Sequence, residues 1–472
     1  MKNLSKSFTF LFVAVFLIIS ANQSFAQRTI HNSIEGIWVG KLEIPGAATL
    51  RIGIIVKEDG SAELNIIDQA TGNIPIDEVS YLGDGVTFIL NKLGITIKGR
   101  VNADKDAIES EFMQRDRKFA LHLSLVDELP KLIRPQTPKA PFGYTSREVE
   151  IENKKANITL QGTLTLPKSK TKVPAVILLT GSGQQGRDQD IAGHKPFWVI
   201  ADYLSENGIA VLRMDDRGIG GSTGDFNRST TGDFASDALA AVAYLKKCEG
   251  IDLNHIGLLG HSEGGSTAAI AACQSNDVKF IISLSGGIVN FGSIVIQQIS
   301  DRLKLQNVPE ENIELEMQWR RTLYEIVREP IDSSAAAEKM WHAYRILPEN
   351  DIKAMNWPEG RMNHMVSQLL SPWWRYILSL DVISLYKKIT CPALLLYGSK
   401  DMQVNAKENY ALMEEAIKPN KKSNITIQII EGVNHLYQTA GTGSEYEYVQ
   451  IEETISPEVL KLISEWIIND TN

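Results

Sequence analysis

The stretch Leu258-Leu-Gly-His-Ser-Glu-Gly-Gly-Ser-Thr-Ala-Ala-Ile270 decides how the rest of the chain is interpreted. Its centre, Gly260 to Gly264, fits the pattern G-x-S-x-G, with an apolar run before it that predicts a buried strand and an alanine-rich run after it that predicts a helix. Ser262 is therefore expected on a tight strand-to-helix turn, where flanking glycines prevent collisions between backbone segments. Because so short a pattern also recurs by chance, a glycine-rich loop without chemistry is the alternative, and the surrounding chain has to decide.

Two residues elsewhere in the chain supply what a serine nucleophile needs. A serine hydroxyl requires a base, and the base requires an orienting acid. Asp401 follows the apolar strand expected at 393–397, and His435 follows the one expected at 425–430. Since the ends of parallel strands meet at one edge of a sheet, the sequence predicts a catalytic triad of Ser262, Asp401 and His435. The alternative for Asp401 is that it only caps a turn.

Acyl transfer also needs hydrogen-bond donors for the oxyanion. One predicted donor is the backbone N–H of Glu263, which opens the helix after the nucleophile. The other is expected from the loop at 180–188, where small residues let the backbone approach the acyl carbon, so that Gly183 or Gln184 supplies the N–H. A phosphate-binding loop is disfavoured, because the loop has neither a GKS/GKT ending nor the pattern G-x-G-x-x-G.

Three other polar residues lie in or near these motifs. Arg217, in the glycine-rich stretch at 213–226, is expected to pair with a carboxylate beneath the oxyanion loop and to act as scaffold. For His261, inside the nucleophile motif, packing is the expected role. His194, in the loop after the first core strand, is predicted to be either a substrate contact or a surface histidine.

The segment 27–134 differs in character from the rest. It contains eight short alternating runs with turn residues between them, which predict a small antiparallel barrel or sandwich. Its opening, Gly36 to Gly40, is similar to that of lipocalins, and Trp38 could plug one end of a barrel. A proline-rich stretch at 129–142 then predicts a semi-rigid linker, and we place the domain boundary between 134 and 135.

Strands alternate with helices in the later chain. Segments 135–286 and 391–472 predict an α/β domain with a mostly parallel sheet flanked by helices. The interval 287–390 has helical periodicity and no strand signal, which indicates an inserted helical cap over the serine side of the sheet. In this cap Trp373, Trp374 and Tyr376 could line a substrate pocket, although tryptophans on amphipathic helices are commonly core residues.

Composition and the N-terminus limit the possible partners. The 472 residues are 43% hydrophobic and 22% charged, with a net charge of −9 and no basic block, which argues against nucleic acid as partner. Two lysines, an apolar run and Ser24-Phe25-Ala26 predict that residues 1–26 form a cleaved signal peptide, so that the mature protein is exported, to the periplasm or beyond, without a membrane segment. The alternative is a signal anchor. Cys248, Cys273 and Cys391 are expected to be buried free thiols; no metal-ligand spacing occurs, and we expect no cofactor.

Several of these motifs together resemble one family. Gly-His-Ser-Glu-Gly at 260–264, Thr-Gly-Ser-Gly at 180–183, the Asp-Asp-Arg-Gly stretch at 215–226, Gly-Ser-Lys-Asp-Met-Gln-Val at 398–404 and Asn-His-Leu-Tyr-Gln at 434–438 resemble bacterial secreted α/β-hydrolase esterases of the serine aminopeptidase-like group. The resemblance covers residues 135–472. It implies an α/β-hydrolase fold and a carboxylesterase that cleaves small acyl esters through an acyl-enzyme, without a cofactor.

Two other functions stay open. A serine peptidase would need a site for a peptide N-terminus, which acidic cap residues such as Glu310, Glu311 and Glu314 could provide. A ligand-binding protein with an inactive hydrolase domain is the third possibility. The N-terminal β-domain could bind ligand, pair subunits in a homodimer or only pack on the hydrolase domain.

Overall fold

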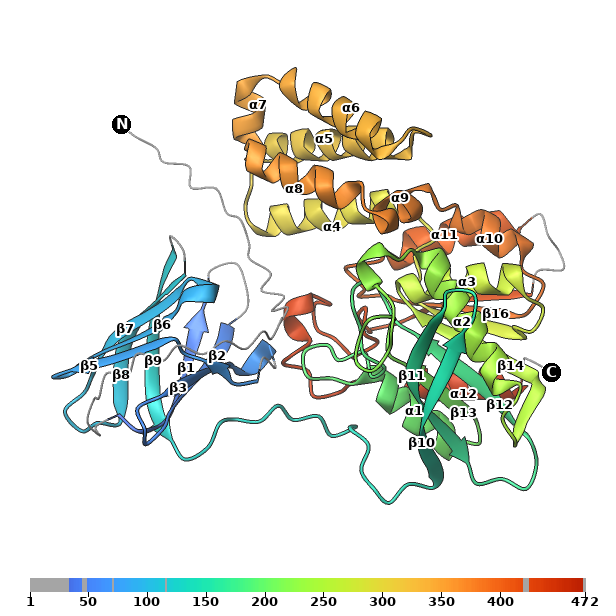
Figure 1. Ribbon diagram of the computed structural model, residues 1–472, viewed down its shortest axis with the longest axis horizontal. Helices are drawn as coiled ribbons and strands as arrows, with labels where there is room; N and C mark the ends of the chain where they lie inside the picture. Colours follow the sequence, from blue (N-terminus) through green and yellow to red (C-terminus); the bar gives the residue numbers. More distant parts are fainter. Residues whose placement is uncertain (1–33, 45–48, 70–71, 115–116, 419–423, 470–472) are drawn as a thin grey trace. The chain divides into compact units, whose positions relative to one another are not determined.

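The computed structural model describes residues 34–44, 49–69, 72–114, 117–418 and 424–469 (Figure 1). The chain folds as two compact units that divide between Arg134 and Pro135, where the proline-rich stretch lies. The predicted signal peptide, residues 1–26, falls outside the described residues. In these described ranges, no helix has both the length and the apolar character needed to cross a membrane.

The N-terminal unit is a single antiparallel sheet of nine strands in the order β4-β3-β2-β1-β9-β8-β7-β6-β5. The strands are β1 (Gly36–Glu43), β2 (Thr49–Val56), β3 (Ala62–Ile66), β4 (Ile74–Pro75), β5 (Glu78–Leu82), β6 (Gly85–Leu90), β7 (Ile95–Val101), β8 (Ala107–Gln114) and β9 (Arg117–Val126), with short 3₁₀ helices η1 (Ile67–Gln69) and η2 (Asn91–Leu93).

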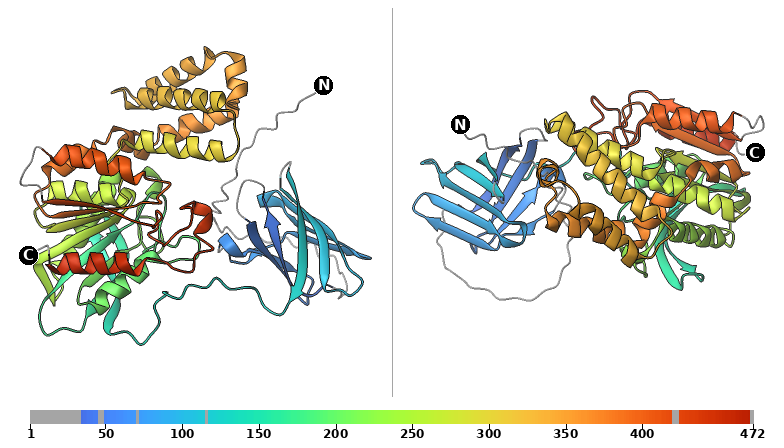
Figure 2. Two further views of the ribbon diagram at one scale, coloured as in Figure 1. Left: turned by 180° about the vertical axis from the view of Figure 1, so that it is seen from behind. Right: turned by 90° about the horizontal axis from the view of Figure 1, so that it is seen from above.

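One apolar core holds this sheet together. Buried and partly exposed residues alternate along β3 and β6, and the buried faces gather around Trp38, Ile54 and Phe88. The indole Nε1 of Trp38 donates to the carbonyl of Ile34 over 2.9 Å. The strand that the sequence did not predict is the two-residue β4. Because the pairing order begins at β4 and ends at β5, the described strands form one curled sheet rather than a closed ring of pairs (Figure 2).

The second unit is built on an eight-stranded sheet in the order β10-β11-β13-β12-β14-β15-β16-β17. Its first two pairings, β10 with β11 and β11 with β13, are antiparallel, and the remaining ones are parallel. The strands are β10 (Tyr144–Asn153), β11 (Ile158–Pro167), β12 (Val173–Leu179), β13 (Ala210–Met214), β14 (Ile251–His261), β15 (Phe280–Leu284), β16 (Ala393–Gly398) and β17 (Ile425–Ile430).

Helices cover both faces of this sheet. Along β12, Ala175, Ile177 and Leu179 join one core, and the alternate residues Val176 and Leu178 join the other. The first core includes α2 (Thr231–Leu245), α3 (Glu263–Gln274) and α11 (Ala406–Ile417), whereas the second includes α1 (Pro196–Glu206) and α12 (Pro457–Asn469). Because both faces are buried, the central strands are continuous apolar runs, which is why the sequence predicted them clearly.

Between β15 and β16 the chain forms a separate stack of helices (Figures 1 and 2). These are α4 (Phe291–Leu305), α5 (Glu310–Arg328), α6 (Ser333–Arg345), α7 (Glu349–Ala354), α8 (Glu359–Leu369) and α9 (Pro372–Ser379). They share an aromatic core that includes Trp319, Tyr344 and Trp357. Of these helices, α9 also contacts α2 and the 3₁₀ helix η3 (Phe226–Arg228).

The last helix of the predicted cap belongs elsewhere. Helix α10 (Val382–Lys388) lies within the interval 287–390, yet its Val382 and Tyr386 pack in the core of the sheet, against α3. The helical insertion therefore ends near α9, before residue 390. Helical periodicity shows that a segment has an apolar face, but it does not show which core that face covers.

Candidate active site

Ser262 lies on a strained turn between β14 and α3. The strand ends at His261, the helix begins at Glu263, and Ser262 has φ 53° and ψ −117°. A Cβ placed at Gly260 would lie 2.0 Å from the carbonyl carbon of Gly264, and one at Gly264 would lie 2.3 Å from the carbonyl oxygen of Leu179. Glycine at both positions permits this close backbone approach, and the packing holds a serine conformation that costs about 1–3 kcal/mol.

Asp401 and His435 form a buried pair at the same edge of the sheet. His435 Nδ1 lies 2.8 Å from Asp401 Oδ2, with the two side chains 4% and 0% exposed. Asp401 Oδ1 accepts the backbone N–H groups of Gln403 and Val404, each over 2.8 Å. Burial acts to raise the pKa of Asp401, but the charge and hydrogen bond of His435 outweigh it and the pKa is lowered. With Nδ1–H donated to this carboxylate, Nε2 is the nitrogen free to act as base when the ring is neutral.

The loop after β12 passes close to Ser262. A Cβ placed at Gly181 would lie 3.4 Å from the Cβ of Ser262, in ordinary van der Waals contact. Further along this loop, Gly183 has φ +93° and the side chain of Gln184 donates to Asn227 over 3.2 Å. Glu263 is the first residue of α3, so its N–H has no carbonyl partner within the helix. The structure thus brings Gly181, at the start of this loop, close to Ser262, which Glu263 directly follows in the chain.

Two consecutive aspartates anchor that loop. Asp216 accepts the Thr180 hydroxyl over 2.7 Å with one oxygen and the Gln185 N–H over 2.9 Å with the other. Asp215 accepts from the guanidinium of Arg187, with 2.7 Å between Nη2 and Oδ2. Burial raises the pKa of Asp216 to about 7. Asp215 and Asp216, in the stretch that follows β13, therefore hold both ends of the loop after β12.

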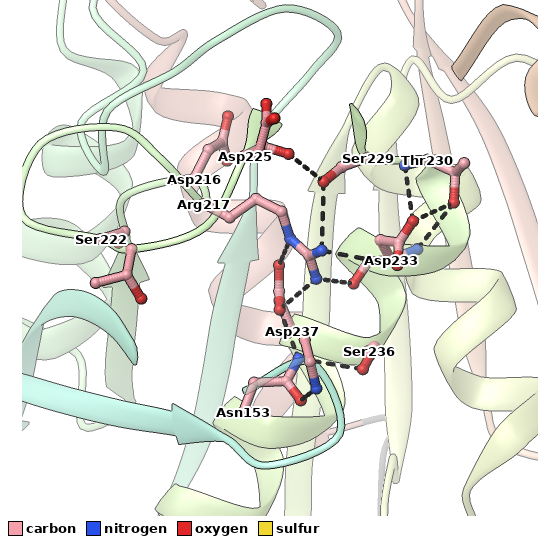
Figure 3. A network of polar contacts seen from close by, with 12 residues as sticks. Asn153, Asp216, Arg217, Ser222, Asp225, Ser229, Thr230, Asp233, Ser236 and Asp237 are labelled. Carbon is pink, nitrogen blue, oxygen red and sulfur yellow. Dashed lines mark hydrogen bonds and ion pairs between the residues drawn. The ribbon is translucent and has the colours of Figure 1, made fainter. Parts of the chain in front are cut away.

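Arg217 turns from that stretch toward α2 (Figure 3). Its Nε and Nη2 donate to the two carboxylate oxygens of Asp237 over 2.7 and 2.8 Å, and Nη2 also donates to the carbonyl of Asp233 over 2.9 Å. Asp237 accepts a further bond from Asn153 Nδ2 over 2.6 Å. The predicted pairing of Arg217 with a carboxylate is confirmed, and its partner is a buried residue of α2.

His261 does more than pack. Its Nε2 donates to the backbone carbonyl of His435 over 2.9 Å, and its Nδ1 lies 2.6 Å from Gln189 Nε2. Burial, together with the charge of His435, lowers the pKa of His261 to about 3, so the ring is neutral and Nδ1 accepts from the amide. His261, the residue before Ser262, therefore holds the backbone of His435, which is predicted as the base.

His194 is not a surface histidine. It is 1% exposed, and its Nδ1 lies 2.9 Å from Thr454 Oγ1 while its Nε2 donates to the carbonyl of Tyr448 over 2.8 Å. Both ring nitrogens thus bond within the protein and join α1's leading loop to the segment before α12. Sequence spacing cannot show these partners, because they lie more than 250 positions away.

The aromatic residues predicted for the pocket have different surroundings. Trp373 donates its indole N–H to Glu263 Oε1 over 2.8 Å. Trp374 packs against Phe291 and Tyr324, with ring centroids 5.6 and 5.9 Å apart. The Tyr376 hydroxyl would lie 2.8 Å from a Cβ placed at Gly232 in α2, so it rests on that helix. The sequence pointed only to the backbone N–H of Glu263, and its side-chain contact with Trp373 leaves no local signal because the two residues lie 110 positions apart.

A cavity of about 500 Å³ opens between the helical insertion and the loop after β16. It reaches Asp401, and its charged lining comprises Asp301, Arg321, Glu325, Arg328 and Glu408. The acids considered as a peptide N-terminus site, Glu310, Glu311 and Glu314, are exposed at the start of α5 and do not line it. Within the described residues, no group of three or more His, Cys, Asp or Glu side chains could hold a metal ion.

The second unit is similar to known hydrolases. Residues 174–435 match the family described as the alpha/beta hydrolase fold. The chain is 24% identical to esterase EstD of Thermotoga maritima over 345 residues, which covers 72% of this chain and 70% of EstD. It is 27% identical to dipeptidyl aminopeptidase BIII of Pseudoxanthomonas mexicana over 248 residues, which covers 45% of this chain and 34% of that enzyme. Among solved structures, the Pyrococcus furiosus esterase Pf2001 matches at 15% identity with a TM-score of 0.42, covering 73% of this chain and 100% of that one.

Proposed function

Because the chain belongs to the alpha/beta hydrolase fold family, we propose that it is a serine hydrolase that cleaves small carboxylic esters. The observation that carries the proposal is the buried pair of His435 and Asp401, 2.8 Å apart, at the sheet edge where Ser262 lies on a strained strand-to-helix turn. Similarity to an esterase along most of the chain supports the ester as substrate class.

The chemistry runs in two steps. His435 Nε2 takes the Ser262 proton as Oγ attacks the ester carbonyl, and Asp401 holds the imidazole with Nδ1–H toward its carboxylate. The N–H of Glu263 and one from Gly183 or Gln184 stabilise the tetrahedral oxyanion. Collapse of this intermediate expels the alcohol, which takes the proton from His435 and leaves an acyl-Ser262. Water, activated by the same histidine, then releases the carboxylic acid.

A serine peptidase is the second candidate, and two observations favour it. One is the partial similarity to an aminopeptidase, and the other is the cavity that holds Asp301, Glu325 and Glu408 beside the triad acid. A protonated peptide N-terminus would be attracted by these carboxylates, although Arg321 and Arg328 in the same lining oppose that attraction.

Parallel assays separate these functions. The wild-type protein and Ser262→Ala are compared on short-chain p-nitrophenyl esters and on aminoacyl- and prolyl-p-nitroanilides. We expect ester turnover in the wild type that the substitution lowers by several orders of magnitude, without amide turnover. Preferred amide cleavage would replace the esterase with the peptidase, and a folded protein silent on both classes would favour a ligand-binding role.

We further propose that the protein is exported after removal of residues 1–26, on the strength of the N-terminal sequence pattern alone. Sequencing the N-terminus of the protein recovered from its native cells tests this. A mature chain that begins at Gln27 is expected, and a chain that retains the apolar run would point to a signal anchor.

A further inference from the structure

The side chain of Glu263 joins three helices at one carboxyl oxygen. Its Oε1 accepts the hydroxyl of Thr231, the first residue of α2, over 2.7 Å, and the indole N–H of Trp373, in α9, over 2.8 Å. Glu263 itself begins α3, directly after the nucleophile. One of these three helices belongs to the helical insertion, and the other two belong to the α/β part.

The second carboxyl oxygen, Oε2, is buried and has no hydrogen-bond partner among the described residues. The whole residue is only 8% exposed. An ionised carboxylate with an unsatisfied oxygen in such a place would be costly, and burial raises the pKa of Glu263 against the lowering effect of its two hydrogen bonds. The group is therefore suited to act as a neutral acceptor with Oε1 rather than as a charge.

Aromatic packing fixes the donor on the insertion side. The Trp373 ring makes edge-to-face contacts with Phe291 of α4 and with Trp374, at centroid distances of 5.3 Å each. Helix α9 also rests on the N-terminus of α2, where a Cβ at Gly232 would lie 2.8 Å from the Tyr376 hydroxyl. The indole N–H thus reaches Glu263 from a packed aromatic cluster that the insertion supplies.

We propose that Glu263 is a positioning residue, whose side chain transmits the docking of the helical insertion through Trp373 to the backbone N–H that faces the oxyanion. The inference rests on the proposed function, because it assigns that N–H to the oxyanion site. The hydrogen bond from Trp373 restricts the first turn of α3. Without this bond, the Glu263 N–H is free to point away from the oxyanion. Such an effect lowers stabilisation of the transition state more than it weakens ground-state binding.

The test compares substitutions that remove the bond from either end. Trp373→Phe keeps an aromatic ring against Phe291 but lacks the donor, and Glu263→Leu lacks the acceptor. Glu263→Gln keeps a carbonyl oxygen that can accept both bonds. Trp341→Phe, in α6, is the matched control, because it removes an indole N–H from the insertion at a residue that packs on Tyr344 and Arg345.

For short p-nitrophenyl esters we expect Trp373→Phe to lower kcat about tenfold with little change in KM, a smaller effect than the loss of a whole oxyanion donor. Glu263→Leu is expected to lower kcat at least as far, Glu263→Gln to recover most of that loss, and the double variant Glu263→Leu/Trp373→Phe to be no worse than Glu263→Leu. Wild-type kcat in Trp373→Phe, or additive losses in the double variant, would overturn the proposal. Because Trp373→Phe is a mild change in the insertion, it decides the matter even if Glu263→Leu does not fold.

A fluorophosphonate probe separates this inference from the proposed function. The rate of covalent labelling at Ser262 depends on the oxyanion site and does not require an ester substrate. If the wild type is labelled at Ser262 but hydrolyses no ester, the ester would be rejected as substrate while the role of Ser262 would stand. The variants would then be compared by their labelling rates. Equal labelling rates in the wild type and Trp373→Phe would reject the proposed effect of the Trp373–Glu263 bond, and would leave the proposed hydrolase function standing.

Discussion

The two sides of Ser262 are held by different kinds of contact. On the sheet side, carboxylates hold the loops: Asp216 accepts from the loop after β12, and Asp237 accepts from Arg217. On the insertion side, Trp373 packs edge to face on Phe291 and Trp374, and its indole N–H donates to Glu263, the residue after Ser262. Charged hydrogen bonds fix the direction of the groups that they join, whereas aromatic contacts fill volume with preferred ring geometries. The difference makes the two sides separately testable, because substitutions on each side remove a different kind of contact.

The largest expected effect comes from changing the sheet side at Asp401, the proposed triad acid. Asp401→Asn keeps the size of the side chain but replaces the carboxylate that accepts His435 Nδ1–H with an amide that can favour the wrong tautomer. We expect kcat on p-nitrophenyl esters to fall by about 10⁴ while the melting temperature changes little. A loss below tenfold would mean that Asp401 only caps its turn.

The next effect concerns the buried ion pair of Arg217 and Asp237. Arg217→Met leaves the Asp237 carboxylate buried without its main partner, and we expect a loss of about 3–5 kcal/mol in the free energy of unfolding by denaturant titration. The exposed pair Lys246–Asp277 is the control, since Lys246→Met should cost less than about 1 kcal/mol. Equal costs at the two positions would contradict the role given to the buried network.

The buried His261 makes the stability of the fold depend on pH. Its folded pKa of about 3 lies below the ordinary value of 6.5, so the unfolded chain binds a proton that the folded chain refuses as the pH falls from 6.5 toward 3. His261 therefore lowers the free energy of unfolding progressively as the pH falls across that window. Asp216, with its pKa raised to about 7, has the opposite slope, and only a difference between variants isolates the histidine.

We accordingly expect the melting temperature of His261→Gln to fall less steeply than that of the wild type between pH 6.5 and 4. Both proteins are measured by circular dichroism in buffers of one ionic strength. Identical slopes would show that His261 is not held neutral by the fold.

The smallest effect is expected on the insertion side, at Trp374. Trp374→Ala removes a ring that packs on Phe291 and Tyr324, and it should shift the preferred acyl length of p-nitrophenyl esters by a few carbons, with selectivity changes of about tenfold. Turnover of the shortest ester should change less. A profile that keeps its shape would make Trp374 a core residue only.

The same contrast explains what the sequence could predict. The central strands, the turn at Ser262 and the placement of Asp401 and His435 after strand ends follow from local apolar runs and short motifs, because a parallel sheet buried on both faces leaves a strong signal. The pairing of Arg217 followed from its motif, but not the identity of Asp237 as partner.

Contacts between distant segments were beyond sequence reasoning. The bond from Trp373 to Glu263 joins residues 110 positions apart, and that from His261 to His435 spans 174. The packing of α10 on the sheet core was missed for the same reason, since an amphipathic face does not name the surface that it covers. The prediction that His194 could be a surface histidine was wrong, because its hydrogen-bond partners, Thr454 and Tyr448, lie near the far end of the chain.

The most direct test of the central claim is the mass of the protein after reaction with a fluorophosphonate probe, followed by peptide mapping. We expect one adduct per chain, on the peptide that contains Ser262, and none in Ser262→Ala. An adduct on another residue, or a folded wild type that does not react, would contradict the assignment of Ser262 as an activated nucleophile.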